Sequence, residues 1–163
     1  MFESNHNTMP AWRIRRGLVA DLPFMFSLAP RLSGVPRPGW HDLASMEAFQ
    51  ERFMQATLNP PSFGAVTFIF ESASSHPVGY IHVEPGKDSI TNEPCGYVAL
   101  LAVTVDAEGK GVASALLAAA ETWAVEQGYR LLSLDVFATN EHAGKFYERA
   151  GFKPETNRLV KVL

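Results

Sequence analysis

Apolar and polar positions repeat along this chain with two periods, one typical of strands and one typical of helices. Runs of β-branched and aromatic residues predict strands over 12–16, 65–70, 78–83, 96–105, 131–137 and 158–163. Apolar residues three and four positions apart predict helices over 21–28, 42–56, 109–127 and 141–150. Because strand and helix alternate in the second half, we expect a parallel crossover there and a mixed α/β fold.

Glycine and proline mark where these elements end. Gly128 and Gly151 follow the last two predicted helices, where glycine is favoured just past a helix end. Prolines and glycines between 30 and 39 predict a loop. No repeat, linker or low-complexity block interrupts the 163 residues, a length typical of one domain. We therefore expect a single domain over 11–163, preceded by a flexible polar arm over 1–10.

Composition and charge exclude several classes of protein. A net charge of -3 argues against a general nucleic-acid-binding face. Cys95 is the only cysteine, which excludes an internal disulfide and a cysteine-rich zinc site and indicates a reducing compartment, so we expect a cytoplasmic protein. No apolar run reaches the roughly eighteen residues of a membrane span. The histidines lack metal-ligand spacing, so no metal site is expected.

The most informative segment is the predicted strand that ends near Val103 and the glycine-bearing loop behind it, which opens a helix. Unpaired backbone N–H groups and the positive end of the helix dipole favour a phosphate at such a position. Gly109 and Gly111 leave room for close approach, and Lys110 adds a cation. The spacing fits neither a dinucleotide-binding loop nor a P-loop, and a tight turn without a ligand is the competing interpretation.

Two ordered motifs resemble those of the GNAT superfamily of N-acetyltransferases. The superfamily signature Gln/Arg-x-x-Gly-x-Gly/Ala has its counterpart here in Glu108-x-x-Gly111-x-Ala113. The downstream run Asn140-x-x-Ala143-x-x-Phe146-Tyr147-x-x-x-Gly151-Phe152 is similar to the second motif of the superfamily. The resemblance covers nearly the whole chain. It implies a GNAT-like twisted mixed sheet of six to seven strands, flanked by about four helices, and acetyl-CoA as co-substrate.

The resemblance also assigns residues to parts of the cofactor. The diphosphate would lie on the loop backbone, and the pantetheine arm would pair with the preceding strand as an added strand does. Asn140 is first of all a good N-cap, and the resemblance adds a hydrogen bond to the pantetheine arm. The implied cofactor-binding residues are Leu101, Ala102, Val103, Gly109, Lys110, Gly111, Val112, Ala113, Ser114, Asn140, Phe146 and Tyr147.

Glu108 departs from the signature, since the superfamily prefers Gln or Arg at this position. A carboxylate beside a diphosphate is repulsive, so Glu108 either points to solvent or weakens cofactor binding. The competing interpretation is a plain acidic residue in a first turn, where the helix dipole favours it. Backbone donors still bind phosphate without help from this side chain.

Acetyl transfer to an amine needs a proton acceptor for the amine and a proton donor for the leaving thiolate. A lysine-like amine is neutral in only about one part in 2,500 at pH 7, a gap of about 4.6 kcal/mol. The resemblance assigns the donor to Tyr147. Its spacing with Ala143, Phe146 and Ala150 equally fits a buried helix face, so a core role is the alternative.

The proton acceptor is less well defined. Asp135 lies within an otherwise apolar predicted strand, and buried carboxylates are either paired or have raised pKa values. Burial with a structural partner is an equally good interpretation of Asp135. His82 and Glu84 share one face of their strand, which faces either the acceptor or solvent. The candidates are therefore Asp135, Glu84 and an ordered-water path, with His82 as a possible substrate contact.

The acceptor is expected to contact the segment 31–61, where Trp40 is the candidate pocket wall and a loop-anchoring Trp is the alternative. The sequence thus predicts an N-acetyltransferase that acts by direct attack of a primary amine, on a small molecule or a peptide, in a ternary complex. The alternatives are a non-catalytic acyl-CoA-binding or regulatory domain and, more distantly, a thiol hydrolase that uses Cys95. Domains of this kind often pair, so a homodimer is possible.

Overall fold

A five-stranded sheet with strand order β1-β2-β3-β4-β5 forms the centre of the molecule. The structure is a computed structural model that describes residues 12–163, so the expected arm over 1–10 lies outside the described residues. The first three strand pairings are antiparallel and the pairing of β4 with β5 is parallel. The strands are β1 (Trp12–Arg16), β2 (Val66–Ser72), β3 (Pro77–Lys87), β4 (Pro94–Val103) and β5 (Leu132–Leu134).

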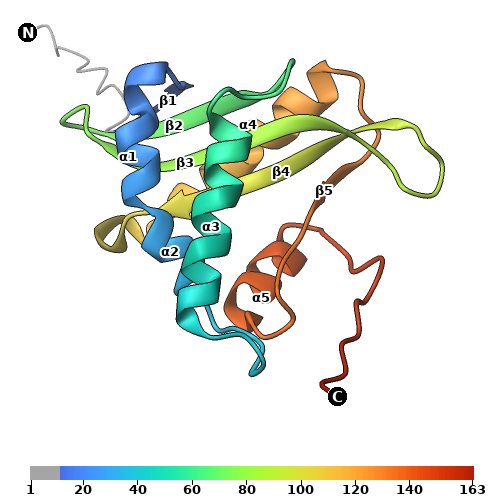
Figure 1. The fold of residues 1–163 in the computed structure, drawn as a ribbon. Helices are drawn as coiled ribbons and strands as arrows, with labels where there is room; N and C mark the ends of the chain where they lie inside the picture. The colour runs from blue at the N-terminus through green and yellow to red at the C-terminus, as the bar shows by residue number, and fades with distance from the viewer. Residues whose placement is uncertain (1–11) are drawn as a thin grey trace, which may run out of the picture.

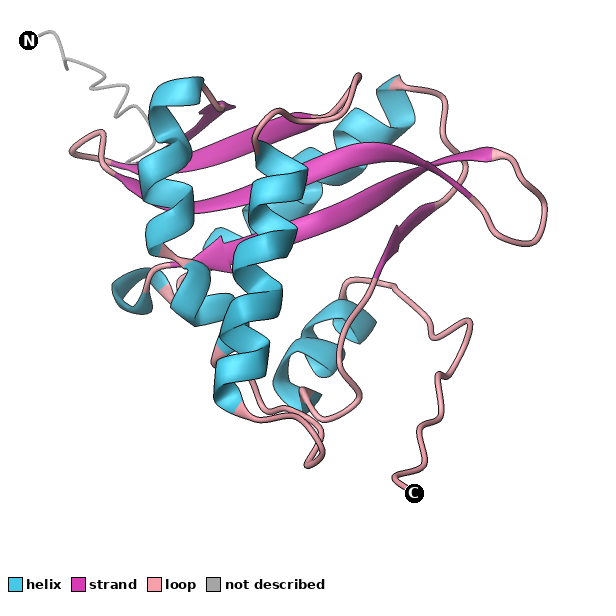
Figure 2. Ribbon diagram, in the orientation of Figure 1, coloured by secondary structure: helices cyan, strands magenta, loops and turns pink. Residues whose placement is uncertain are grey.

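Helices cover both faces of this sheet. Figures 1 and 2 show α1 and α3 in front of the sheet and α4 behind it, with α5 beside the end of β5. Because β4 and β5 are parallel, α4 forms the expected crossover between them. The helices are α1 (Leu22–Ser27), α2 (Ala29–Ser33), α3 (Leu43–Leu58), α4 (Val112–Glu126) and α5 (Glu141–Arg149), with 3-10 turns η1 (Val19–Asp21) and η2 (Val105–Ala107).

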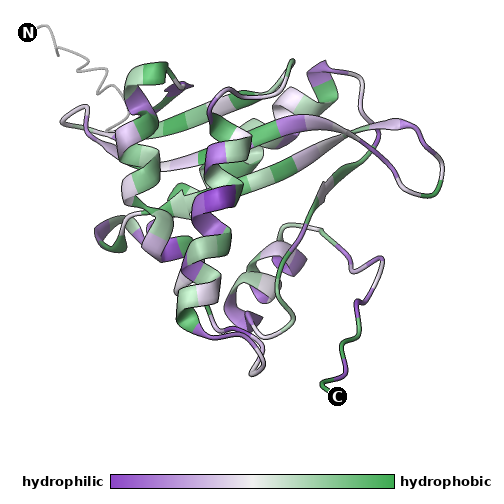
Figure 3. Cartoon of the chain, viewed as in Figure 1, coloured by the Kyte–Doolittle hydropathy of each residue, from purple (hydrophilic) through white to green (hydrophobic). Residues whose placement is uncertain are grey.

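Each face of the sheet has its own hydrophobic core, because strand side chains alternate between the two faces. On the α4 face, Ile81 and Val98 pack with Leu116 and Trp123. On the other face, Tyr80 and Leu100 pack with α1 and α3. In Figure 3 the strands carry mostly hydrophobic colours, whereas α3 also carries hydrophilic ones. The mixed α/β sheet predicted from the sequence is thus confirmed.

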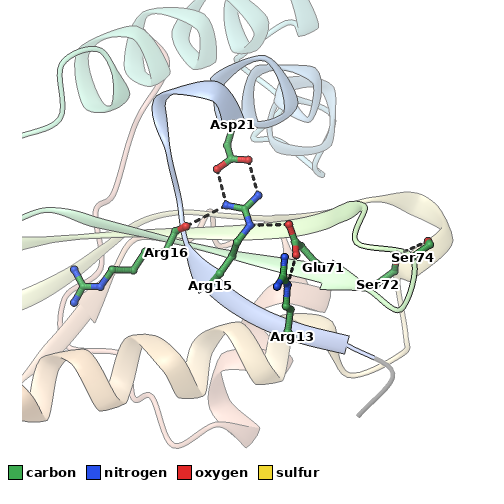
Figure 4. Close-up of polar contacts among 7 residues, drawn as sticks. All are labelled: Arg13, Arg15, Arg16, Asp21, Glu71, Ser72 and Ser74. Carbon is green, nitrogen blue, oxygen red and sulfur yellow. Dashed lines mark hydrogen bonds and ion pairs between the residues drawn. The ribbon is translucent and has the colours of Figure 1, made fainter. Parts of the chain in front are cut away.

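A buried charged network joins β1, β2 and the turn before α1 (Figure 4). Arg15 donates two hydrogen bonds of 2.8 Å to Asp21 and one of 2.6 Å to Glu71. Arg13 also pairs with Glu71, at 2.5 Å, and the backbone N–H of Leu18 donates to Asp21. The arginines hold the pKa values of both buried carboxyls below their usual range. This network fixes the corner where the chain leaves the sheet edge and enters α1.

Two details of the predicted fold are wrong. The sheet has five strands rather than six or seven, and the segment 158–163 is irregular and exposed. Its β-rich composition does not make it a strand, because a strand exists only where a neighbour supplies backbone partners. The loop predicted for 30–39 contains α2, in which Pro30 occupies the first turn, where its missing N–H costs nothing. Residues 12–163 therefore contain five α-helices, where about four were expected.

Candidate active site

The loop after β4 leaves an uncapped helix N-terminus. Gly109 and Gly111 have φ angles of +72° and +81°, a region that favours glycine. Gly111 is the N-cap of α4 and, lacking a side chain, caps nothing. The backbone N–H of Ala115 makes the first helical bond, to the carbonyl of Gly111. The N–H groups of the preceding turn therefore remain available to an anion.

The two glycines of this loop border open space, whereas the residue that follows them is packed against the sheet. A Cβ placed on Gly109 or Gly111 would meet no atom within 4 Å, so the space before both glycines is open. The side chain of Val112 is buried in the α4 core, and a Cβ on Gly79 of β3 would lie 3.0 Å from it. The first turn of α4 is therefore anchored on the sheet through Val112, with open space beside the two glycines that precede it.

The strand that leads into this loop has a free edge. β4 pairs with β5 only from Gly96 to Val98, so the two strands separate beyond Val98. The register with β3 moves from His82–Leu100 to Val83–Val98, which makes Ala99 a bulge at the point of separation. The predicted pantetheine-binding segment 101–103 therefore lies on an edge that β5 leaves unpaired.

A cavity of about 310 Å³ lies between α4 and α5. It brings together Ser114 and Phe146, two of the predicted cofactor-binding residues that lie on different helices. Its other lining residues are Leu117, Ala118, Glu121, Arg149 and Ala150. The structure thus juxtaposes residues from the two sequence motifs.

Tyr147 lies on α5 next to this cavity wall. Its ring packs edge to face with Phe146 and Phe152, at centroid distances of 5.1 and 5.7 Å, and contributes to the α4-face core. Burial raises the pKa of Tyr147 to about 12, so its hydroxyl stays protonated at neutral pH. Asn140 caps α5 as expected, since its side chain accepts from the N–H of Ala143 at 3.3 Å.

Glu108 forms an ion pair with a residue from another element. The guanidinium of Arg31, on α2, donates to the Glu108 carboxylate at 2.5 Å and to the carbonyl of Val103 at 3.2 Å. No sequence pattern indicates this pair, because the two residues lie 77 positions apart. Glu108 is thus neutralised by a neighbour, a third possibility beside the two considered from the sequence.

Asp135 lies outside a strand, in contrast to the prediction. β5 ends at Leu134, and Asp135 is exposed just beyond it. The hydroxyl of Tyr97 on β4 donates to its carboxylate at 2.9 Å. Burial of the Tyr97 side chain, together with this bond, raises the pKa of Tyr97. Sequence reasoning missed Tyr97, which joins the two strands near the point where they separate.

His82 and Glu84 share one side of β3, as predicted. His82 is only 1% exposed, its Nδ1 lies 2.8 Å from the Thr67 hydroxyl, and its Nε2 has no hydrogen-bond partner. Nε2 lies 3.9 Å from the Glu84 carboxylate, which also accepts from Ser62 at 3.1 Å. Burial lowers the pKa of His82 to about 4, so the ring is neutral at pH 7. His82 also lines a second cavity, of about 220 Å³, with residues of the β1–α1 corner and the end of α3.

The loop between α2 and α3 lies against the segment that leads into α5 (Figure 1). The hydroxyl of Thr139 donates to the carbonyl of Pro36 at 2.8 Å and joins the two segments. Trp40 is about half exposed on this loop, with its ring beside His41. The role of Trp40 as a pocket wall stays a prediction.

Cys95 is buried, and burial raises the pKa of its thiol, which is the opposite of what a nucleophile needs. Across residues 12–163, no group of three His, Cys, Asp or Glu side chains is placed to hold a metal ion. None of the helices described in that range has the length and apolar character that a membrane crossing requires.

A free strand edge that runs into an open helix N-terminus fits proteins that bind a long, phosphate-bearing ligand along a strand. The chain belongs to the acetyltransferase (GNAT) family, whose model matches residues 30–152. The resemblance inferred from the two motifs is confirmed by this match. Enzymes of this family are acetyl-CoA-dependent N-acetyltransferases.

Solved structures of acetyltransferases share this fold at low sequence identity. A putative acetyl transferase from Pyrococcus furiosus is 22% identical, with a TM-score of 0.72 over 93% of this chain and 99% of that one. A GNAT protein from Ralstonia eutropha is 20% identical, with a TM-score of 0.71 over 93% and 98%. The aminoglycoside N-acetyltransferase AAC(6')-Iy in complex with CoA is 21% identical, with a TM-score of 0.65 over 93% of each chain. No curated protein sequence matches the chain.

Proposed function

We propose that this protein transfers the acetyl group of acetyl-CoA to a primary amine by direct attack in a ternary complex. One observation carries the proposal: the unpaired edge of β4 leads directly into the open amide groups at the start of α4. A strand edge suits the amides of pantetheine, and a helix N-terminus suits the diphosphate that follows them. The strand edge and the helix N-terminus thus lie in the same order as the pantetheine arm and the diphosphate of acetyl-CoA.

The cofactor contacts follow from this arrangement. The pantetheine arm pairs with the backbone of Leu101, Ala102 and Val103, and the diphosphate accepts from the loop between Gly109 and Ser114. The open space before Gly109 and Gly111 supports close approach of phosphate oxygens. The cavity that Ser114 and Phe146 share extends the same path between α4 and α5. Lys110 is exposed beside the loop and adds a positive charge.

Tyr147 is the proposed donor to the leaving sulfur. In the transfer step, the amine nitrogen forms a bond to the thioester carbon and the carbon–sulfur bond breaks, with its electron pair going to sulfur. A hydroxyl that stays protonated stabilises the developing thiolate by a hydrogen bond and supplies its proton. The core role considered from the sequence is compatible with this, because the ring packs while the hydroxyl serves the reaction.

The proton lost by the amine passes to a carboxylate or to ordered water. Glu84 and Asp135 are the candidate acceptors, and Tyr97 links them across β4, since it pairs with Glu84 in the strand register and donates to Asp135. His82 is buried next to Glu84, so it influences the acetyl acceptor only through the Glu84 carboxylate. Two carboxylates on one face favour a positively charged amine, with Trp40 as a wall of its site.

Two variants test the enzymatic proposal with a panel of small primary amines and acetyl-CoA. Tyr147→Phe keeps the ring packing, so we expect CoA affinity to stay the same and kcat to fall by roughly 100-fold or more. Tyr129→Phe is the matched control, because Tyr129 packs on Trp123 in the same core, and its kcat should not change. An unchanged kcat for Tyr147→Phe would remove this residue from the mechanism. Tight CoA binding without transfer to any amine would favour the non-catalytic acyl-CoA-binding alternative.

A further inference from the structure

The side chain of Arg31 extends from α2 to the segment between the end of β4 and the start of α4, where the proposed cofactor site lies. Its Nε donates to the carbonyl of Val103, the last residue of β4, and its Nη2 donates to Glu108, the residue before the glycine loop. The guanidinium therefore bridges the proposed pantetheine and diphosphate segments. No other part of α2 makes a side-chain hydrogen bond to either segment in the described structure.

The charges around the loop show why this cation matters. The segment 105–111 carries two acidic residues, Asp106 and Glu108, and one basic residue, Lys110. By itself it therefore opposes a dianionic diphosphate. Arg31 brings the local sum to zero and removes the repulsion from the carboxylate nearest the glycines.

The guanidinium also has capacity left for a ligand. It carries five N–H donors in a planar fork, and the two protein contacts use one donor each. The side chain remains 36% exposed, so the ion pair is not sealed from solvent. A planar fork with free donors is well suited to phosphate oxygens.

We infer that Arg31 is a diphosphate-binding residue and that Glu108 is the positioning residue that holds it. The cation that the superfamily signature often places at position 108 is supplied from α2 instead, and the carboxylate at 108 orients it. This inference rests on the proposed function, because it assumes that the diphosphate lies at the α4 N-terminus.

The competing role for Arg31 is purely structural. Its neighbour Leu32 packs into the α1–α3 core, so Arg31 also tethers α2 to the loop. A structural tether affects every ligand of the groove equally. A diphosphate contact affects only ligands that carry a diphosphate.

Calorimetry with three ligands separates these roles. For Arg31→Ala we expect CoA and dephospho-CoA, which both contain the diphosphate, to bind roughly ten- to a hundredfold more weakly. Pantetheine lacks the diphosphate, so its affinity should be the same for the variant and the wild type. That affinity is measured by competition with acetyl-CoA and corrected for the weaker acetyl-CoA binding of the variant. Arg52→Ala, which removes an exposed arginine from α3, is the control for the loss of one positive charge and should bind CoA normally.

A second variant tests the role of Glu108. Glu108→Gln should change CoA affinity by less than about threefold, because the amide oxygen of Gln still accepts a hydrogen bond from Arg31 and keeps it in position. Adding Glu108→Gln to Arg31→Ala should recover part of the lost affinity, because it removes the carboxylate that Arg31 no longer pairs. An equal loss for pantetheine, no recovery in the double variant, or unchanged CoA binding in Arg31→Ala would each overturn the inference. Failure of the wild type to bind CoA would instead contradict the proposed function.

Discussion

Replacing Arg15 by Met tests whether the buried charged network holds the β1–α1 corner. Arg15 bridges Asp21 and Glu71, and its side chain is 26% exposed. Methionine retains most of the apolar stem, so the variant removes the charge and its hydrogen bonds with little loss of packing. Arg13 is the matched control, since it pairs with the same Glu71 but is 64% exposed.

The expected cost follows from what remains after the substitution. Asp21 would keep only the N–H of Leu18, and Glu71 would keep Arg13. Removing one partner of a buried ion pair costs about 3–5 kcal/mol, and the retained bonds place Arg15→Met near 3 kcal/mol. For a chain of this length that corresponds to a fall in Tm of about 6–12 °C. Arg13→Met should cost less than about 1 kcal/mol, because the Arg13 side chain is mostly exposed and Glu71 keeps its hydrogen bond from Arg15.

The pH dependence provides a second measurement. The arginines lower the pKa values of Asp21 and Glu71, and Arg15 is the largest cause for both. These carboxylates therefore contribute stability that is present above their unfolded pKa values near 4 and is lost as pH falls through the lowered folded values. Urea unfolding should show a constant wild-type advantage from pH 5 to 8 that narrows below pH 4. An equal cost for both variants, or an undiminished difference at pH 3, would refute the reasoning.

Two further substitutions test the loop and the buried histidine. Gly111→Ala places a side chain at a φ of +81°, so we expect the free energy of unfolding to fall by about 1–2 kcal/mol and CoA to bind more weakly in calorimetry. The control is Gly128→Ala, at a φ of +76° beyond the other end of α4, which should cost similar stability without loss of CoA affinity. Weaker CoA binding in both variants would contradict a local role for the loop. His82→Gln should flatten the stability profile between pH 7 and 5, because the folded pKa of His82 near 4 lies below its ordinary value and wild-type stability is lost as pH falls through that interval. A profile that keeps its slope in urea unfolding would exclude His82 as its source.

The parts predicted well from the sequence are those with local signals. The apolar run of β4, the two glycines and the amphipathic α4 and α5 are all contiguous patterns, and both the crossover and the glycine loop before α4 follow from them. α2 was missed because Pro30 was interpreted as a break, although proline is well tolerated in a first helical turn. The segment 158–163 has strand-like composition but no neighbour to pair with, which composition alone does not reveal.

The site contacts that could not be predicted are those made across the fold. Arg31 meets Glu108 from 77 positions away, and Tyr97 meets Asp135 from 38 positions away. Neither pair belongs to a helix or hairpin with fixed spacing. The early end of β5 moved Asp135 out of the sheet and changed it from a buried to an exposed carboxylate. Such contacts depend on register and strand length, which the hydrophobic pattern defines only to within a few residues.

A crystal structure with acetyl-CoA tests the central claim most directly. We expect diphosphate oxygens at about 3 Å from backbone nitrogens between Gly109 and Ser114, with the pantetheine amides beside residues 101–103. A diphosphate bound away from the start of α4, or a pantetheine arm that makes no backbone contact with β4, would contradict it.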